Sequence, residues 1–179
     1  FVSTINAFTL GAQQVKPDIK VNVIWVNTWF DPAKEQSSAE ALIAAGNDVI
    51  FSMAQDTPSV VSVAERKGVY VLNLNSSMKT YAPEYYLGVI KTDWAPLFLS
   101  AVEAHMNGTF KGEYTWLGME DDVVVVEDWN KDISPETMAR IKEIEATIHS
   151  GEMKVFTGPL VNQAGEVAVE DGVVLADDL

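Results

Sequence analysis

Three segments of the chain open with an oxygen-bearing side chain directly before a proline and close at a glycine. The oxygen can accept hydrogen bonds from the free amide groups of a helix start, and proline fits the first turn because its missing N–H costs nothing there. Glycine commonly closes a helix because it adopts the left-handed conformation easily. This punctuation predicts helices over residues 32–46, 58–68 and 135–150. The opening pairs are Asp31-Pro32, Thr57-Pro58 and Ser134-Pro135, and the closing glycines are Gly46, Gly68 and Gly151.

Short apolar runs rich in β-branched residues lie between the predicted helices. Two more helices are predicted, one over residues 4–15 and one that follows Asp93 and closes at Gly108. Apolar runs of four to eight residues that alternate with helices are typical of β-α-β units. The predicted fold class is therefore α/β, a three-layer sandwich with a mainly parallel sheet. The runs cover residues 21–26, 48–53, 69–74, 86–90 and 123–126.

The pattern changes after Gly151. Two alternating stretches, residues 153–156 and 166–169, predict short strands on either side of Gly158-Pro159 and Gly165. We therefore expect one α/β ligand-binding lobe over residues 1–151, and a strand-rich tail over residues 152–179 that packs on the same lobe.

Composition excludes several function classes. Twelve Lys and Arg residues stand against 26 Asp and Glu residues, a net charge of −14, and such a surface repels nucleic-acid phosphates and anionic lipid. The chain has no cysteine, which removes disulfides, thiol nucleophiles and Cys-ligated metals. No apolar stretch approaches the ~20 residues of a membrane helix. The chain opens at Phe1 without a signal-peptide pattern, so we expect a processed protein, a fragment or a piece cut at a domain boundary.

Candidate binding residues gather where the predicted strands end. In open parallel sheets, ligands bind beyond the carboxyl ends of the strands, and the helices that start there aim backbone N–H groups at the same region. An aromatic platform with a few polar groups suits a flat heterocycle that carries hydroxyls. The residues at these ends are Trp29, Asp56, Asn75, Ser77, Lys91 and Trp94.

Each of these residues also has an ordinary structural interpretation. Trp29 and Trp94 could pack in the core, and Asp56 could cap the helix at Pro58. Lys91 ends a buried strand, where its charge needs solvation or a partner. Asp56 has no histidine, lysine or second carboxylate close in the sequence, so hydrogen bonding to a ligand is favoured over general-base catalysis.

No strong catalytic or cofactor motif is present. The glycine patterns of dinucleotide sites, P-loops and serine hydrolases are missing, and the acidic runs at residues 120–122 and 127–128 lack the spacing of a calcium loop. The sequence therefore predicts no metal, no cofactor and no catalytic residue. An alternative is a small nucleoside hydrolase-like or transferase domain that uses Asp56 and Lys91.

Over nearly its whole length the sequence resembles the basic membrane lipoprotein family, the PnrA-like substrate-binding proteins of ABC transporters. No single piece is specific, but their combination in this order is. The pieces are INAF at 5–8, GA at 11–12, NVIWV at 22–26, WFDPAK at 29–34, ALI at 41–43 with Gly46 and Asp48, AE at 64–65, GV at 68–69, AP at 82–83, GT at 108–109, and VF-x-GP at 155–159 with Gly165.

The resemblance implies a lobe like those of type I periplasmic binding proteins, which close on a ligand. Known members bind purine nucleosides or related purines for import. Trp29 matches the aromatic that faces the base, Asp56 falls in a segment that lines the pocket, and Lys91 matches a lysine near the ribose in some members. Ser77 departs from the family, since many members place an aspartate there for the ribose hydroxyls, and a free base or another heterocycle therefore stays open as a ligand.

The resemblance also implies partners and a place in the cell. Family members carry a first lobe of comparable size, and this chain matches only the second. We expect an ABC permease as partner, together with the missing first lobe or a self-associated copy, and no nucleic acid. The expected location is periplasmic or extracytoplasmic, with a lipid anchor in the full-length protein. A second alternative is an interaction domain that pairs with a separately encoded first lobe.

Overall fold

The computed structural model describes residues 1–54 and 57–175. Asn22–Ile141 form one compact unit, and Phe1–Val21 together with Lys142–Leu179 form another. The boundary predicted after residue 151 stays a prediction.

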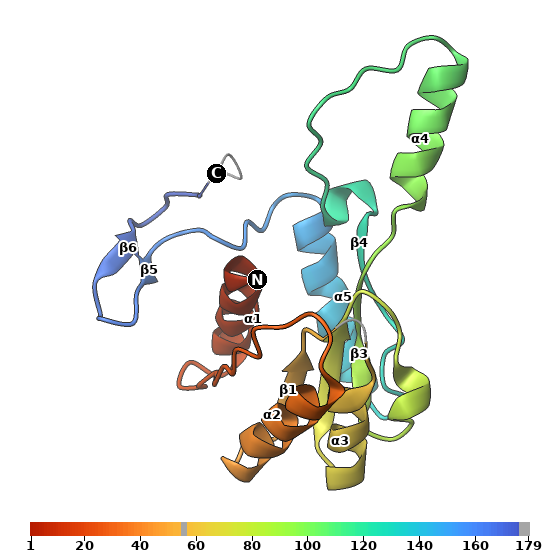
Figure 1. The fold of residues 1–179 in the computed structure, drawn as a ribbon. Coiled ribbons are helices and arrows are strands. Elements are labelled where there is room, and N and C mark those ends of the chain that lie inside the picture. The colour runs from red at the N-terminus through yellow and green to blue at the C-terminus, as the bar shows by residue number, and fades with distance from the viewer. Residues whose placement is uncertain (55–56, 176–179) are drawn as a thin grey trace. The chain divides into compact units, whose positions relative to one another are not determined.

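The larger unit is built on a four-stranded sheet with the strand order β1-β2-β3-β4 (Figure 1). The first three strands are parallel, and β4 runs antiparallel to β3. This mainly parallel sheet flanked by helices confirms the predicted α/β class. The strands are β1 (Val49–Ser52), β2 (Tyr70–Leu74), β3 (Tyr86–Thr92) and β4 (Val124–Glu127).

The helices of this unit begin and end where the capping residues predict. The Asp31 carboxylate accepts from the Lys34 N–H at 3.1 Å, and Thr57 Oγ1 accepts from the Ser59 N–H at 3.2 Å. Both contacts satisfy amides that a helix start leaves free. The closing glycine Gly68 has a φ of 67°. The helices are α2 (Pro32–Ala44), α3 (Ser59–Lys67), α4 (Ala95–Met106) and the first half of α5 (Pro135–His149), with short 3-10 turns at Lys79–Tyr81 and Met119–Asp121.

The hydrophobic core lies between the sheet and the pair α2 and α3, which lie side by side against it (Figure 1). Valines dominate this core because β-branched side chains pack well on a pleated surface. Full burial of each such side chain is worth about 1.5–3 kcal/mol. The core is Ala39, Ile50, Val60, Val61, Val63, Ala64, Val71, Met78, Ala82, Tyr86 and Val89.

The strand predicted over residues 21–26 is wrong. This segment forms no strand, and its apolar side chains Val23, Ile24 and Trp25 are 41–57% exposed. Within the described part of the chain, no backbone hydrogen bond joins it to the free edge of β1. An apolar run has the propensity for a strand, but it becomes one only where a neighbouring strand supplies backbone partners.

The smaller unit holds α1 (Val2–Val15), the second half of α5 and a two-stranded antiparallel ribbon of β5 (Leu160–Val161) and β6 (Val167–Val169). The predicted strand over residues 153–156 is wrong, whereas the one over 166–169 is confirmed. The reason is the turn: the Asn162 N–H donates to the Glu166 carbonyl at 2.9 Å, and Gly165 has a φ of 83°. A tight turn pairs the residues that flank it, so residues 160–161 are paired and 153–156 are left outside.

Gly158 is the position of the ribbon that is least tolerant of a side chain. A Cβ there would lie 1.9 Å from the Glu170 carbonyl oxygen, a backbone atom that cannot rotate away. We expect Gly158→Ala to separate the two segments and to break the bonds from the Gly158 N–H to the Val173 carbonyl and from the Gly172 N–H to the Gly158 carbonyl. Hydrogen exchange should show faster exchange at the amides of Gly158 and Gly172.

A matched control for this substitution is Gly11→Ala in α1, where nothing lies within 4 Å of the added Cβ. That change should leave the exchange rates of the ribbon unchanged. Unchanged protection of the ribbon amides in Gly158→Ala would contradict the packing described here.

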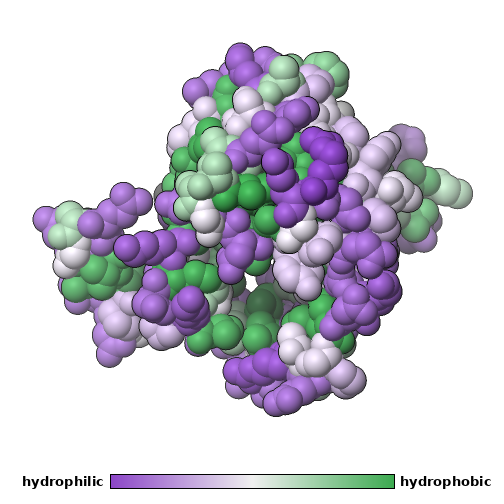
Figure 2. All heavy atoms as spheres, turned by 90° about the horizontal axis from the view of Figure 1, so that it is seen from below, coloured by the Kyte–Doolittle hydropathy of each residue, from purple (hydrophilic) through white to green (hydrophobic). Residues whose placement is uncertain are grey.

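Many large apolar side chains reach the surface. On the face drawn in Figure 2, hydrophobic and hydrophilic residues lie side by side. The apolar residues of α4 contribute strongly, with Phe98, Leu99 and Met106 at 62–79% exposure. No helix among the described residues combines the length and the hydropathy that crossing a membrane would need.

Candidate functional site

Four of the described candidates lie at or just after the ends of β2 and β3, namely Asn75, Ser77, Lys91 and Trp94, and Trp29 precedes the start of α2. Since β1, β2 and β3 are parallel, their carboxyl ends meet at one edge, and the starts of α2 and α3 are joined after β1 by the contact between Glu35 and Thr57. We call this region the carboxyl edge and define it by the described residues 27–31, 53–54, 57, 75–78 and 91–94. Asp56 lies outside the described residues, so its predicted role has no structural test.

The segment after β2 is held against the end of β3. Asn75 has a φ of 71°, and its N–H donates to the Ile90 carbonyl at 2.7 Å. The Thr92 hydroxyl lies 3.5 Å from the Asn75 amide oxygen. The structure thus brings Asn75 together with the β3 end that carries Lys91, as the sequence predicts. Ser77, two residues on, is exposed, and its hydroxyl faces the Lys79 N–H at 3.5 Å.

A buried polar network supports the same segment from below. The Tyr86 hydroxyl donates to the Asn73 amide oxygen and accepts from the Met78 N–H at 3.1 Å. The Asn73 amide donates to the Leu74 and Ser76 carbonyls at 3.1 and 2.7 Å. Asn73 and Tyr86 are 0% and 1% exposed, so this network fixes the backbone on both sides of Asn75. Burial raises the pKa of the Tyr86 phenol.

Trp29 lies on the segment that leads into α2. Its side chain is 72% exposed, so the alternative that it packs in the core is wrong, and an aromatic face is presented to solvent. The helix cap directly behind it is firm, because Asp31 accepts from the Lys34 N–H and Pro32 occupies the first helical position. The Lys34 N–H stabilises the charged form of Asp31 and lowers the pKa of its carboxyl.

Lys91 is already partnered. Its ammonium lies 3.1 Å from Oε1 of Glu127 on the neighbouring strand β4, and both side chains are partly exposed, at 35% and 44%. The hydrogen bond to Glu127 and the charge of that carboxylate raise the pKa of Lys91. An exposed pair of this kind is worth little for stability, but it holds the ammonium group at the carboxyl edge.

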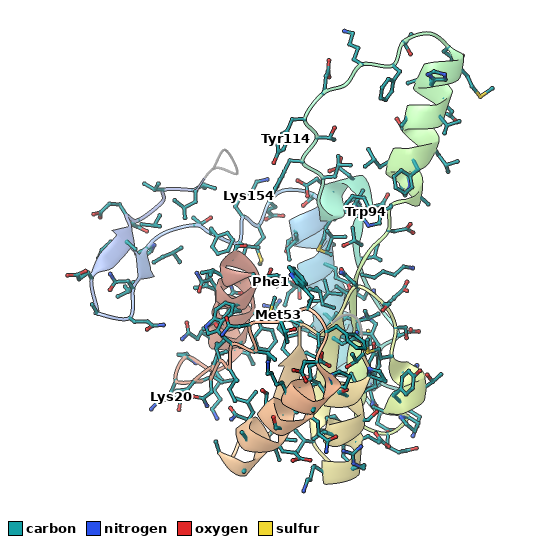
Figure 3. All side chains as sticks on the ribbon, in the orientation of Figure 1. Phe1, Lys20, Met53, Trp94, Tyr114 and Lys154 are labelled. Carbon is teal, nitrogen blue, oxygen red and sulfur yellow. The ribbon has the colours of Figure 1, made fainter. Side chains whose placement is uncertain are left out.

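Trp94 stands at the start of α4, directly after the end of β3 (Figure 3). Its ring stacks with Phe98 one turn further on, with centroids 6.4 Å apart, and it remains 52% exposed. The Trp94 ring therefore packs on a neighbour, as the structural interpretation expects, and about half of its surface also remains exposed, as a binding residue requires.

Two supports of this edge were not predicted from the sequence. The burial of Glu35, in the first turn of α2, could not be predicted, since its neighbours in the sequence are mostly polar and favour a solvent-exposed helix face. Asn73 does carry one: a single amide inside the apolar run 69–74 must find hydrogen-bond partners when the strand is buried.

A hollow in the larger unit lies away from this edge. It measures about 950 Å³ and lies between α4 and the segment that returns to β4. None of the five described candidate residues lines it. Among the described residues, no cluster of three or more His, Asp or Glu side chains could hold a metal ion. At the carboxyl edge, the described groups offer an aromatic face, amide and hydroxyl groups and a cation, which is the chemistry of binding.

Comparison with curated proteins identifies relatives along almost the entire chain. A purine-binding protein of Brucella abortus is 37% identical over 172 residues, covering 96% of this chain and 48% of that protein. A protein of Haloferax volcanii, named as an ABC transporter glucose-binding protein, is 34% identical over 157 residues, covering 88% and 40%. The chain thus spans about half the length of these curated relatives.

Solved structures share the fold. An ABC transporter solute-binding protein from Conexibacter woesei superposes with a TM-score of 0.66 at 19% identity, covering 83% of this chain and 50% of that one. A solute-binding protein from Aeropyrum pernix gives 0.61 at 18% identity, covering 83% and 51%. At these identities the likeness shows the fold alone.

The family profile for the ABC transporter substrate-binding protein PnrA-like group matches residues 1–157. This match takes in the α/β unit, the carboxyl edge and every candidate residue. The family consists of binding proteins and not of enzymes, which removes the support for the hydrolase or transferase alternative. The chain belongs to the PnrA-like family of ABC transporter substrate-binding proteins.

Proposed function

We propose that this chain supplies one lobe of a solute-binding protein that captures a purine base or purine nucleoside for an ABC importer. The observation that carries the proposal is the 37% identity, over 96% of the chain, to a protein named as purine-binding. The exposed aromatic face of Trp29 at the carboxyl edge supports it independently, because base–aromatic stacking is worth about 1–3 kcal/mol per base.

Each candidate residue has a role in this proposal. Trp29 stacks on the base, Asp56 and Asn75 exchange hydrogen bonds with its edge, and Trp94 borders the site. Lys91 contacts ribose hydroxyls, held in place by Glu127. Ser77 adds a hydroxyl where an aspartate would accept two ribose hydrogen bonds, so the base contributes more of the affinity than the sugar.

One lobe presents half of a clamp. Closing two lobes excludes water and strengthens every polar contact inside, so we expect this chain alone to bind weakly. The partners proposed are a first lobe or a second copy of the chain, and an ABC permease. The proposed location is extracytoplasmic. Mass measurement in solution tests the second-copy alternative, which a clean monomer at high concentration would contradict.

A sugar is the second candidate ligand, because the Haloferax volcanii relative is named as glucose-binding and is 34% identical. Equilibrium dialysis of the chain against labelled adenosine, adenine, cytidine and glucose separates the two. Retention of adenosine and adenine above cytidine and glucose supports the purine proposal. Retention of glucose alone would contradict the purine proposal and support a sugar as the ligand.

Substitution of Lys91 tests the ribose contact. We expect Lys91→Gln to weaken adenosine binding by about 1 kcal/mol, the order of one hydrogen bond, and to leave adenine binding unchanged, since the free base has no ribose. Calorimetric or NMR titration with both ligands measures the difference.

The matched control is Lys131→Gln. Lys131 also pairs with a glutamate, Glu84, at 3.3 Å, its pKa is likewise raised by that partner, and it lies outside the carboxyl edge. Equal losses for adenosine and adenine in Lys91→Gln would remove Lys91 from the ribose site.

A further inference from the structure

The buried carboxylate of Glu35 has no role in the proposal above. Glu35 lies in the first turn of α2 and is 4% exposed. Burial of a carboxylate is costly unless hydrogen bonds compensate it, and replacing a buried polar link by apolar side chains is often neutral or stabilising. The core between α2 and α3 already packs these helices together. Packing of the two helices therefore does not by itself require a carboxylate at this position.

The two oxygens of Glu35 bind two different segments. Oε1 accepts from the Asp31 N–H at 3.2 Å, and Oε2 accepts from the Thr57 hydroxyl. Thr57 is itself 4% exposed, and its oxygen also accepts from the Ser59 N–H at 3.2 Å. One side chain thus joins the start of α2 to the start of α3.

Both joined segments belong to the carboxyl edge. Asp31 follows Trp29 by two residues, and Thr57 is the next residue after Asp56 in the chain. The Glu35 carboxylate therefore connects Asp31, next to the proposed stacking residue Trp29, with Thr57. An aromatic platform binds a flat ligand only at the correct distance from its polar partners, since small displacements cost affinity.

We propose that Glu35 is a positioning residue, which holds the Trp29 segment at a fixed distance from Thr57 through its bonds to Asp31 and Thr57. It touches no ligand itself. This inference rests on the purine-binding function proposed above, and it adds a determinant of affinity that lies beneath the binding surface.

The test is a set of variants of this link measured in the full chain. Thr57→Val removes the hydroxyl at nearly constant volume, Thr57→Ser keeps it, and Glu35→Gln removes one acceptor. We expect Thr57→Val and Glu35→Gln to weaken adenosine binding about tenfold, the loss of one hydrogen bond to a buried charge. Thr57→Ser should bind like the wild type.

Two further readouts separate positioning from a general loss of stability. In the Trp29→Ala background, Thr57→Val should cost little more affinity, because residues that act as a unit are not additive. Without ligand, Thr57→Val should shift the amide and indole N–H resonances of Trp29, whereas Thr57→Ser should not. Both are read in folded protein, so a modest loss of stability does not obscure them.

Asn130→Ala is the control. Asn130 is also a buried polar link, 7% exposed, whose amide donates to the Glu84 and Tyr86 carbonyls at 3.0 and 2.7 Å. It should lower stability without changing affinity. Wild-type chain that retains no purine overturns the proposed function. Wild-type chain that binds adenosine, with Thr57→Val binding equally well or with additive losses in the Trp29→Ala background, overturns the role of Glu35 alone.

Discussion

Trp29→Ala will weaken adenosine binding by about 1–3 kcal/mol, the range measured for one lost stacking contact. The indole is 72% exposed at the carboxyl edge, so its removal leaves no cavity in the core and should change the unfolding free energy by less than about 0.5 kcal/mol. Titration of both proteins with adenosine, together with urea unfolding, separates the two effects.

The control for this substitution is Tyr70→Ala. Tyr70 is also an exposed aromatic, at 43%, but it begins β2 and so lies at the opposite end of that strand from Asn75. Its removal should leave adenosine affinity unchanged. An unchanged affinity in Trp29→Ala would take Trp29 out of the site and remove the main structural support for the purine.

Tyr86→Phe will lower the free energy of unfolding by about 1–3 kcal/mol. The hydroxyl is the donor to the Asn73 amide oxygen and the acceptor for the Met78 N–H. Both groups are buried, and a buried group that loses its partner costs its full desolvation penalty. Urea unfolding measures the change, and Tyr81→Phe, at an exposed tyrosine, should stay within about 0.5 kcal/mol of wild type.

Because of the same hydroxyl, we expect the free energy of unfolding to depend on pH in the alkaline range. Because burial raises the pKa of Tyr86 above the ordinary value of 10.0, the folded state favours the protonated phenol. The stability that the protonated Tyr86 phenol contributes is fully present below pH 10 and is lost as the pH rises through the folded-state pKa. Wild type should therefore lose more stability than Tyr86→Phe as the pH rises above 10. Parallel losses in the two proteins would place the titration elsewhere.

The features that the sequence predicted correctly are those that neighbouring residues decide. Asp31 caps α2 through the Lys34 N–H, three residues on. Thr57, just before α3, accepts from the Ser59 N–H, and Gly68 closes α3 with a φ of 67°. Such interactions need no knowledge of the rest of the fold. The parallel pairing of β1 with β2 follows from α3, the helix that connects them, whereas β2 and β3 are also parallel but are joined by a segment that holds only a 3-10 turn.

The features that the sequence did not predict depend on distant partners. Residues 21–26 have the composition of a strand, yet they pair with no neighbour among the described residues. Lys91 was predicted to contact ligand hydroxyls or an acidic partner, but the sequence did not identify Glu127, which the antiparallel strand β4 places beside it. Glu35 finds Thr57 across 22 residues. No local sequence pattern predicts contacts between residues this far apart in the chain.

The measurement that tests the central claim most directly is an amide-shift NMR titration of the labelled chain with adenosine, adenine and guanosine at millimolar concentration, with glucose and cytidine as controls. NMR titration detects the weak binding that we expect of a single lobe. The account predicts that purines alone shift resonances, and that the shifts cluster at Trp29, Asp56, Asn75, Ser77 and Lys91. A well-dispersed spectrum without shifts, or shifts confined to the hollow beside α4, would contradict a purine site at the carboxyl edge.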